Sequence, residues 1–154
     1  MVSDYMLNIY VDGDACPVKD EVFRVAERHN LKVYLVSNSW HRIGANPLIQ
    51  QVVVSQGPDV ADDWIAERIG VGDIVITSDI PLADRCIKNA ARAIAPTGKL
   101  FTPDSIGMTL AVRNLMTDLR ETGEMTGSNT SFTKQDRSRF LSELETQIIA
   151  IKRQ

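Results

Sequence analysis

The segment LNIYVDGDACPVK, residues Leu7 to Lys19, decides the fold, because a buried strand ends in it and a helix begins in it. A largely apolar run at 7–11 stops at two aspartates, Asp12 and Asp14, which a single glycine separates. Pro17 follows closely, and proline fits the first turn of a helix because no backbone N–H is needed there. The segment therefore predicts a strand that delivers two carboxylates to its carboxyl end and leads at once into a helix.

The rest of the chain repeats this alternation of short apolar strands and amphipathic helices. Further strands are predicted at 31–37, 52–55, 73–79 and 91–96, and further helices within 57–73, 81–92, 103–123 and 134–152. Because the strands are apolar runs without polar alternation, they fit a parallel sheet that is covered by helices on both faces.

The chain length of 154 residues is typical of one domain. We therefore expect a single α/β domain over residues 1–154, a three-layer sandwich with a central, mostly parallel sheet. A loop is expected near 123–133, before the C-terminal helix at 134–152.

Composition and charge exclude several classes of protein. Hydrophobic residues make up 44% of the chain, charged residues 24%, and the net charge is −3. This balance argues against coating nucleic acid by charge alone, although it allows a local basic groove. Two cysteines do not make a disulfide framework, and no segment resembles a signal peptide or a membrane span. We therefore expect a cytoplasmic protein that does not bind membranes.

Aspartates lie at the ends of two predicted strands. Asp12 and Asp14 follow the first strand, and Asp79 ends the strand at 73–79. Ligand sites in open α/β sheets lie beyond the carboxyl ends of the strands, so parallel strands would bring these three carboxylates to the same end of the sheet. Each aspartate taken singly is equally well explained as a turn or helix-capping residue.

Further aspartates lie near the starts of two predicted helices. At about 100° per residue, Asp62 lies about 60° from the centre of the apolar face and can point into a cleft, whereas Asp63 faces water. Asp59 is best explained as the N-cap of that helix. Asp84 lies five residues after Asp79 in the first turn of another helix, where it also complements the helix dipole.

Carboxylates gathered at one site repel each other and stay ionised only when a cation neutralises them. Their oxygens are hard ligands that suit Mg²⁺ or Mn²⁺, and such an ion would hold a phosphate, activate a water molecule and stabilise the leaving oxygen. This chemistry serves phosphodiester hydrolysis, with Asp12, Asp62 and Asp79 as the expected catalytic residues. The expected metal ligands are Asp12, Asp14, Asp62 and Asp79, with Asp59 and Asp84 as additional candidates.

Basic and aromatic residues are placed to contact a substrate. Trp40, His41 and Arg42 lie in a loop after the second predicted strand, and this combination can stack a base and hold a phosphate of single-stranded nucleic acid. Lys19 can pair with an aspartate or with substrate, and Arg137 can face a phosphate. The alternatives are a surface loop with a half-buried Trp40 and, for Arg137, the solvated start of a helix.

Three other residues that could carry chemistry are better explained as structural. Cys16 and Cys86 lie near the aspartates but are expected to be small buried side chains, since thiolates match hard metal ions poorly. His29 lies near the end of the first helix, where it complements the helix dipole.

Four segments resemble the signature segments of the YaiI/YqxD family of small bacterial proteins. They are YVDGDACPVK at 10–19, GPDVADDWI at 57–65, GDIVITSDIPLADRC at 72–86 and FTKQDRSRF at 132–140. That family is largely uncharacterised and is similar to PIN-like and NYN nuclease domains. The resemblance spans nearly the whole chain and implies a PIN-like fold with a metal-binding acidic cluster that acts on RNA or another nucleic acid.

The resemblance also assigns individual residues. Asp12 and Asp14 occupy the strand-end acidic motif, and Asp79 stands in DIPLA. The motif DVAD contains Asp59 and Asp62.

The chain departs from the expected family pattern at two places. Thr97 in the segment PTG stands where an arginine is expected, which puts a phosphate contact in doubt. The segment GSNTSFT at 127–133 lacks the expected proline ahead of FT, a change that affects loop geometry.

Three functions are compatible with these residues. The first is a metal-dependent nuclease, and the second is a non-catalytic protein that binds metal and nucleic acid in the same cleft. The third is a phosphatase of the haloacid-dehalogenase type, because DGD and the pair Asp79 and Asp84 resemble its acidic motifs. That fold, however, needs a loop and hairpin where Pro17 starts a helix, and Cys16 stands where Thr or Val is usual. The sequence alone does not decide whether the protein is catalytic, whether it acts on RNA or on DNA, or whether it assembles into a homo-oligomer.

Overall fold

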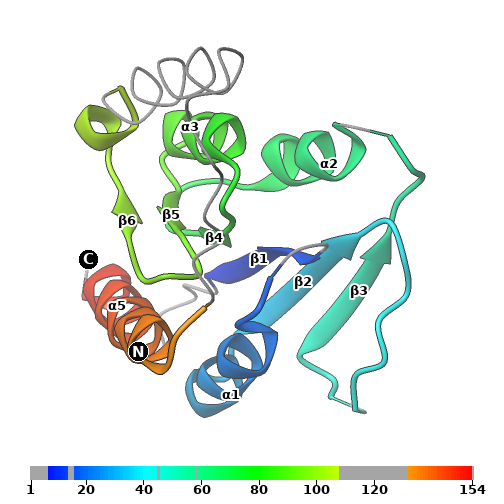
Figure 1. The fold of residues 1–154 in the computed structure, drawn as a ribbon, viewed down its shortest axis with the longest axis horizontal. Coiled ribbons are helices and arrows are strands. Elements are labelled where there is room, and N and C mark those ends of the chain that lie inside the picture. The colour runs from blue at the N-terminus through cyan, green and yellow to red at the C-terminus, as the bar shows by residue number, and fades with distance from the viewer. Residues whose placement is uncertain (1–6, 14–15, 45, 58, 108–131, 154) are drawn as a thin grey trace, which may run out of the picture.

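The computed structural model describes residues 7–13, 16–44, 46–57, 59–107 and 132–153 (Figure 1). Asp14, most of the expected long helix at 103–123 and most of the expected loop at 123–133 lie outside these residues, although residues 103–107 are helical. The elements are, in chain order, β1 Asn8–Asp12, α1 Lys19–His29, β2 Lys32–Ser37, β3 Ile49–Val53, α2 Val60–Arg68, β4 Ile74–Ile76, α3 Ile80–Lys88, β5 Arg92–Ile94, β6 Leu100–Phe101 and α5 Lys134–Lys152.

The strands form one sheet in the order β3-β2-β1-β4-β5-β6. The first five strands in this order are parallel, and β6 runs antiparallel to β5. Helices α1 and α5 lie on one side of the sheet, and α2 and α3 lie on the other (Figure 1). The expected α/β sandwich with a central, mostly parallel sheet is therefore confirmed.

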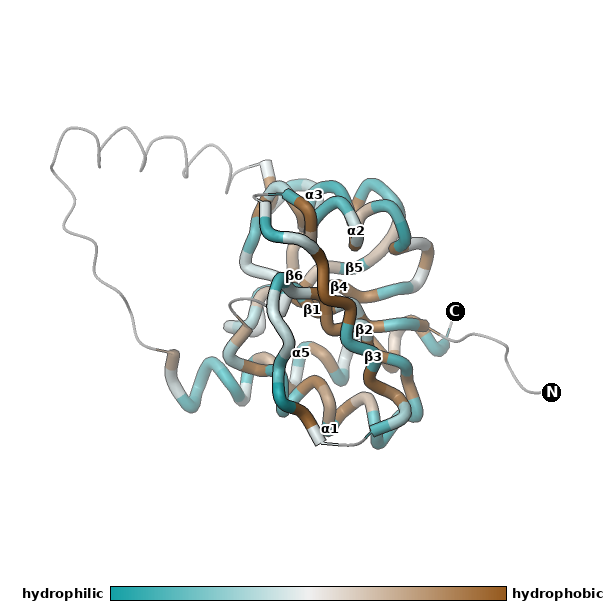
Figure 2. Tube along the Cα trace, turned by 90° about the vertical axis from the view of Figure 1, so that its right-hand side faces the viewer, coloured by the Kyte–Doolittle hydropathy of each residue, from teal (hydrophilic) through white to brown (hydrophobic). Residues whose placement is uncertain are grey.

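The apolar residues of the sheet pack into two cores, one on each face. In β1, Ile9 and Val11 contribute to the core under α1 and α5, whereas Tyr10 contributes to the core under α2 and α3. Figure 2 shows the hydrophobic residues concentrated along the central strands and the hydrophilic residues on the outer surfaces of the helices. Burial on both faces explains why the strands are apolar runs. Among the described residues, no helix is long and apolar enough to cross a membrane.

Several element boundaries differ from those expected. Strand β3 begins at Ile49 instead of residue 52, because this edge strand includes two glutamines that obscure its apolar pattern. The two-residue strand β6 was not expected, since so short a segment has no recognisable period. Helix α3 ends at Lys88, and Ala90 then adopts a positive φ of 66°.

The ends of the first and last helices show how local sequence positions them. Pro17 lies in a turn before the N-cap Val18, so it precedes the first turn of α1 that it was expected to occupy. Helix α5 has the expected bounds because Thr133 and Asp136 form a reciprocal capping box at its start.

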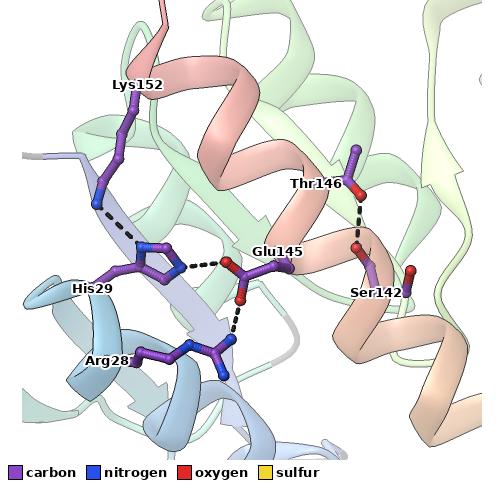
Figure 3. A network of polar contacts seen from close by, with 6 residues as sticks. All are labelled: Arg28, His29, Ser142, Glu145, Thr146 and Lys152. Atoms are coloured by element: carbon purple, nitrogen blue, oxygen red, sulfur yellow. Dashed lines mark hydrogen bonds and ion pairs between the residues drawn. The ribbon is translucent and has the colours of Figure 1, made fainter.

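Polar contacts join α1 to α5 on the same side of the sheet (Figure 3). Glu145 of α5 accepts hydrogen bonds from Arg28 and His29, and Lys152 Nζ lies 3.1 Å from His29 Nδ1. Burial acts to raise the pKa of Glu145, but its bonds and charge interactions with His29 and Arg28 together hold that pKa below its usual value. His29 therefore has specific partners on α5 in addition to its place at the end of α1.

We expect Glu145→Gln to lower the free energy of unfolding at pH 7 by about 1 kcal/mol, the scale of partly exposed ion pairs. Because the pKa of Glu145 is lowered in the folded protein, its contribution is present above about pH 4.5 and is lost as the pH falls through the folded-state pKa. Urea denaturation at pH 7 and pH 3 measures this, with Glu27→Gln on the exposed side of α1 as control. An equal loss of unfolding free energy at pH 7 and pH 3 would contradict the assigned role of the Glu145 carboxylate.

The turn between β5 and β6 packs directly against the backbone of α5. Gly98 in this turn has a φ of +93°, and a Cβ atom on it would lie 2.6 Å from the Arg139 carbonyl carbon and 2.7 Å from Phe140 N. Only glycine permits both this conformation and this close approach. Gly98 therefore allows the end of the sheet and α5 to meet.

We expect Gly98→Ala to lower the free energy of unfolding by about 2–4 kcal/mol, because it combines left-handed backbone strain with overpacking. Gly70→Ala is the matched control, since a Cβ there meets nothing within 4 Å and the backbone is not in the left-handed region. The control should change stability by less than about 1 kcal/mol. Chemical denaturation of both variants tests the comparison, and similar effects would exclude a special role for Gly98.

Candidate functional site

The sheet has a topological switch point between β1 and β4. The chain leaves β1 toward β2 and leaves β4 toward β5, in opposite directions across the sheet. In open α/β sheets the ligand crevice lies outside the carboxyl ends of the strands at such a point. Asp12 is the last residue of β1, and Thr77 and Asp79 follow directly after β4. These residues therefore lie where a ligand site is expected.

The hydroxyl group of Thr77 connects the two strand ends. Thr77 Oγ1 donates a hydrogen bond to Asp12 Oδ2 at 3.0 Å and accepts one from the Asp79 backbone N–H at 3.0 Å. Asp79 is the N-cap of α3, and its Oδ1 accepts a hydrogen bond from Leu82 N at 2.9 Å. The buried Thr77 thus fixes the orientation of Asp12 and the backbone of Asp79 together.

Asp62 reaches the same region from α2. Burial, together with the negative charges of Asp79, Asp12 and Asp59 and against the opposing charge of Arg85, raises the pKa of Asp62 to about 6. The structure thus brings Asp62 into electrostatic contact with the aspartates at both strand ends. Asp63 is exposed on α2 and pairs with Arg85 at 2.8 Å.

The other aspartates occupy different positions. Asp59 stands at the N-cap of α2, but its side chain makes no capping hydrogen bond, so the expected capping role is wrong for the side chain. Asp84 forms an ion pair with Lys88 on the next turn of α3, at 2.9 Å. Asp14 lies outside the described residues.

The chemistry of the donor groups can be compared with the needs of a metal ion. Within the described parts of the chain, no three His, Cys, Asp or Glu side chains are grouped closely enough to hold a metal ion together. Mg²⁺ is nevertheless commonly bound through only one or two carboxylates, with water and substrate phosphates as its other ligands. Asp12 and Asp79, with Asp62 nearby, are donors of this kind.

The two cysteines are structural, as expected. Cys16 and Cys86 are both buried and free. Burial raises the pKa of the Cys16 thiol to about 11 and that of the Cys86 thiol to about 12. Both side chains are therefore neutral thiols near pH 7 and pack as small apolar groups.

Lys19 and His41 lie at the same end of the sheet as Asp12. Lys19 Nζ is 3.3 Å from the carbonyl oxygen of Gly13 and 3.5 Å from His41 Nδ1. The backbone of His41 is held by Gln51 of β3, which accepts from the His41 N–H at 2.9 Å and donates to the His41 carbonyl at 2.6 Å. The loop after β2 is thus attached to both α1 and β3.

The remaining candidate substrate contacts differ in how accessible they are. Trp40 is 72% exposed, so the alternative of a half-buried tryptophan is wrong, and Arg42 is also exposed. Arg137 instead donates to the Glu21 carboxylate at 3.1 Å and to the Pro17 carbonyl at 3.0 Å. Its guanidinium therefore docks α5 onto α1.

Two functional candidates were missed by reasoning from the sequence. Thr77 follows a strand in the segment TSD, and a hydroxyl group at such a turn readily bonds to nearby backbone. The sequence could therefore have indicated that the Thr77 hydroxyl bonds to the backbone near Asp79. Gln51 had no comparable signal, because its bonds to His41 depend on how the loop folds back onto β3.

The sheet order and the carboxylates at its switch point define a doubly wound α/β domain with an acidic site at the carboxyl ends of its strands. The chain belongs to the YaiI/YqxD family: the sequence profile described as "Uncharacterized BCR, YaiI/YqxD family" matches residues 10–150. The resemblance inferred from the four sequence segments is therefore confirmed. No solved structure shows a significant match to the chain.

Curated relatives match the chain over almost its entire length. A UPF0178 protein of Rhodopseudomonas palustris (strain TIE-1) is 62% identical over 152 residues, which cover 99% of this chain and 96% of the relative. A UPF0178 protein of Parvibaculum lavamentivorans is 60% identical over 148 residues, which cover 96% of this chain and 97% of the relative. A third UPF0178 protein, from Nitrobacter winogradskyi, is 60% identical over 147 residues, which cover 96% of this chain and 94% of the relative.

We expect Asp62→Asn to raise the free energy of unfolding at pH 8 by about 1 kcal/mol in metal-free buffer. The rise in pKa from 3.8 to about 6 would correspond to about 3 kcal/mol in a dry site, and solvent screening reduces this at a half-buried position. The folded protein holds the Asp62 proton more tightly than the unfolded chain does. The loss of stability caused by ionising Asp62 in the wild-type protein is therefore absent below about pH 4 and complete above about pH 6.

Urea denaturation between pH 3.5 and pH 8 measures this difference. Asp63→Asn is the matched control, because it removes a neighbouring but exposed carboxylate that is paired with Arg85. The control should lower stability slightly at pH 8. A loss of stability in Asp62→Asn at pH 8 would show that Asp62 is not crowded by negative charge.

Proposed function

We propose that the protein is a metal-dependent nuclease that hydrolyses phosphodiester bonds in the cytoplasm, with RNA as its substrate. The observation that supports this most directly is the electrostatic grouping of Asp12, Asp62 and Asp79 at the switch point of the sheet. Carboxylates that repel one another without a cation suit a site that binds metal and phosphate together. The likeness of the family's signature segments to PIN-like and NYN nuclease domains supports the same reaction.

The ligands of Mg²⁺ or Mn²⁺ in this proposal are Asp12 and Asp79, with water and substrate phosphate as the other ligands, and Asp62 lies beside them. When bound, such an ion neutralises charge on the phosphate and promotes attack by water. Thr77 holds Asp12 Oδ2 and the Asp79 backbone in place, so that the two carboxylates are oriented before substrate arrives. Asp62 reaches the same site from α2 and is suited to accept a proton from the attacking water.

The connection between β1 and α1 favours this proposal over a phosphatase of the haloacid-dehalogenase type. Residues 13–18 alone separate the end of β1 from the start of α1, and Pro17 and Val18 form a turn within them. A loop and hairpin of the kind that such a phosphatase carries after its first aspartates has no room there. Attack by water is therefore preferred to attack by an aspartate.

We expect the protein to cleave single-stranded RNA with Mg²⁺ or Mn²⁺ and to lose this activity with EDTA. Asp12→Asn and Asp79→Asn should each lower the cleavage rate at least about 100-fold, because they remove charge from the site. Asparagine can still accept the hydrogen bond from Thr77 and can still cap α3, so both variants should remain folded. Cleavage of labelled RNA and DNA, with Mn²⁺ binding measured by calorimetry, tests these expectations.

Asp63→Asn is the control in this assay, because Asp63 is an exposed aspartate next to Asp62. It should cleave at the wild-type rate. A wild-type protein that binds Mn²⁺ and RNA without cleaving either nucleic acid would instead be a non-catalytic binding protein. Unchanged activity and metal binding in both Asp12→Asn and Asp79→Asn would refute the proposed site.

A further inference from the structure

Two basic side chains that are 22 residues apart in the sequence meet beside the acidic site. Lys19 Nζ lies 3.5 Å from His41 Nδ1. The same ammonium group lies 3.3 Å from the carbonyl oxygen of Gly13, the residue directly after Asp12. The pair is therefore placed next to the end of β1, where the proposed reaction takes place.

The hydrogen-bonding roles of this pair follow from the chemistry of lysine. An ammonium group has donors and no acceptor, so His41 Nδ1 accepts from Lys19 and the imidazole carries its proton on Nε2. Among the described residues, this Nε2 is a buried polar atom with no hydrogen-bond partner. A buried donor without a partner in a folded protein points to a bound water, ion or ligand. Because Nε2 is enclosed, a phosphate oxygen from outside can meet only the ammonium group of Lys19, which His41 Nδ1 keeps in place.

The surrounding structure holds these donors in place. Gln51 pins the backbone of His41 through two hydrogen bonds, so the loop after β2 is ordered at this point. The N-cap of α1, Val18, provides no side-chain hydrogen bond to the first turn of that helix. The first turn of α1 also carries Asp20 and Glu21, so the charge of Lys19, and not the end of the helix, attracts the anion.

An exposed aromatic residue adjoins the pair. Trp40 directly precedes His41 and is 72% exposed, and it is the one aromatic among the large hydrophobic side chains that the described residues expose. Exposed aromatic rings next to basic residues bind single strands, because unpaired bases present a flat face for stacking. Bases within a duplex are already stacked on their neighbours and cannot use such a platform.

We propose that Lys19, held in place by His41, binds a phosphate of a single-stranded nucleic acid and that Trp40 stacks on a neighbouring base. The substrate class named here rests on the proposed nuclease function, and it makes that function selective for single strands. Lys19 supplies the charge and His41 orients it, while Trp40 distinguishes a single strand from a duplex. The strand then runs from the loop after β2 toward Asp12.

Fluorescence anisotropy with a labelled single-stranded RNA, in EDTA and again in Ca²⁺, tests this proposal without cleavage. Lys19→Gln, His41→Ala and Trp40→Ala should each weaken single-strand binding about tenfold. Lys19→Gln should also lower the slope of log affinity against log salt by about 0.7, because one phosphate contact by a charge is lost. His41→Ala should leave this slope unchanged, and Lys19→Arg should restore it.

Lys32→Gln and Val71→Ala are the controls, because both residues lie away from the loop and Val71 is as exposed as Trp40. They should bind like the wild-type protein. The affinity for duplex RNA should not respond to Trp40→Ala. Wild-type affinity in Lys19→Gln and Trp40→Ala, or no single-strand binding by the wild-type protein, would overturn the proposal.

The cleavage assay separates this inference from the proposed function. Binding that depends on Lys19, His41 and Trp40 in a protein that never cleaves RNA would support the single-strand site and refute the nuclease. Cleavage that depends on Asp12 but tolerates all three substitutions would support the nuclease and refute the single-strand site.

Discussion

Strands β1 and β4 pair in parallel from Ile9↔Ile74 to Val11↔Ile76, and this register determines which side chains meet at the carboxyl end of the sheet. It places Asp12 beside Thr77, so that one hydroxyl group can hold a carboxylate from the first strand and the backbone of Asp79 after the fourth. Shifting the pairing by one residue would move every side chain of β1 to the opposite face. The two cores and the acidic site therefore depend on the same register.

The crowding of negative charge at this end of the sheet lowers the stability of the folded protein near neutral pH. Asp62 is half-buried beside Asp79 and Asp12, and its raised pKa shows that the folded chain resists its ionisation. Apolar packing on both faces of the sheet offsets this penalty. Natural proteins commonly retain unfavourable local interactions of this kind at functional sites, where activity requires them.

Much of this arrangement could be predicted from the sequence, because it follows from local patterns. The apolar run before Asp12 and the amphipathic pattern at 134–152 locate β1 and α5, and the helical projection of α2 separates Asp62 from Asp63. Strand β3 was misplaced because its glutamines break the apolar pattern at the edge of the sheet.

The features that could not be predicted depend on residues far apart in the chain. The contact between Lys19 and His41 and the clamp by Gln51 exist only once the loop after β2 has folded back. The bond between Thr77 and Asp12 likewise joins residues 65 positions apart. No periodicity or spacing in the sequence records such contacts, although each residue type is suited to the role it takes.

Helix α5 shares one core with the first strand, and its Arg137 bonds to Pro17, 120 residues earlier in the chain. During synthesis Ile9 and Val11 therefore emerge long before the residues that cover them, Phe140 and Leu144. Until that helix docks, one face of the central strand exposes apolar surface of the kind that promotes aggregation. The nascent chain thus depends on its late segments to cover this face of the sheet.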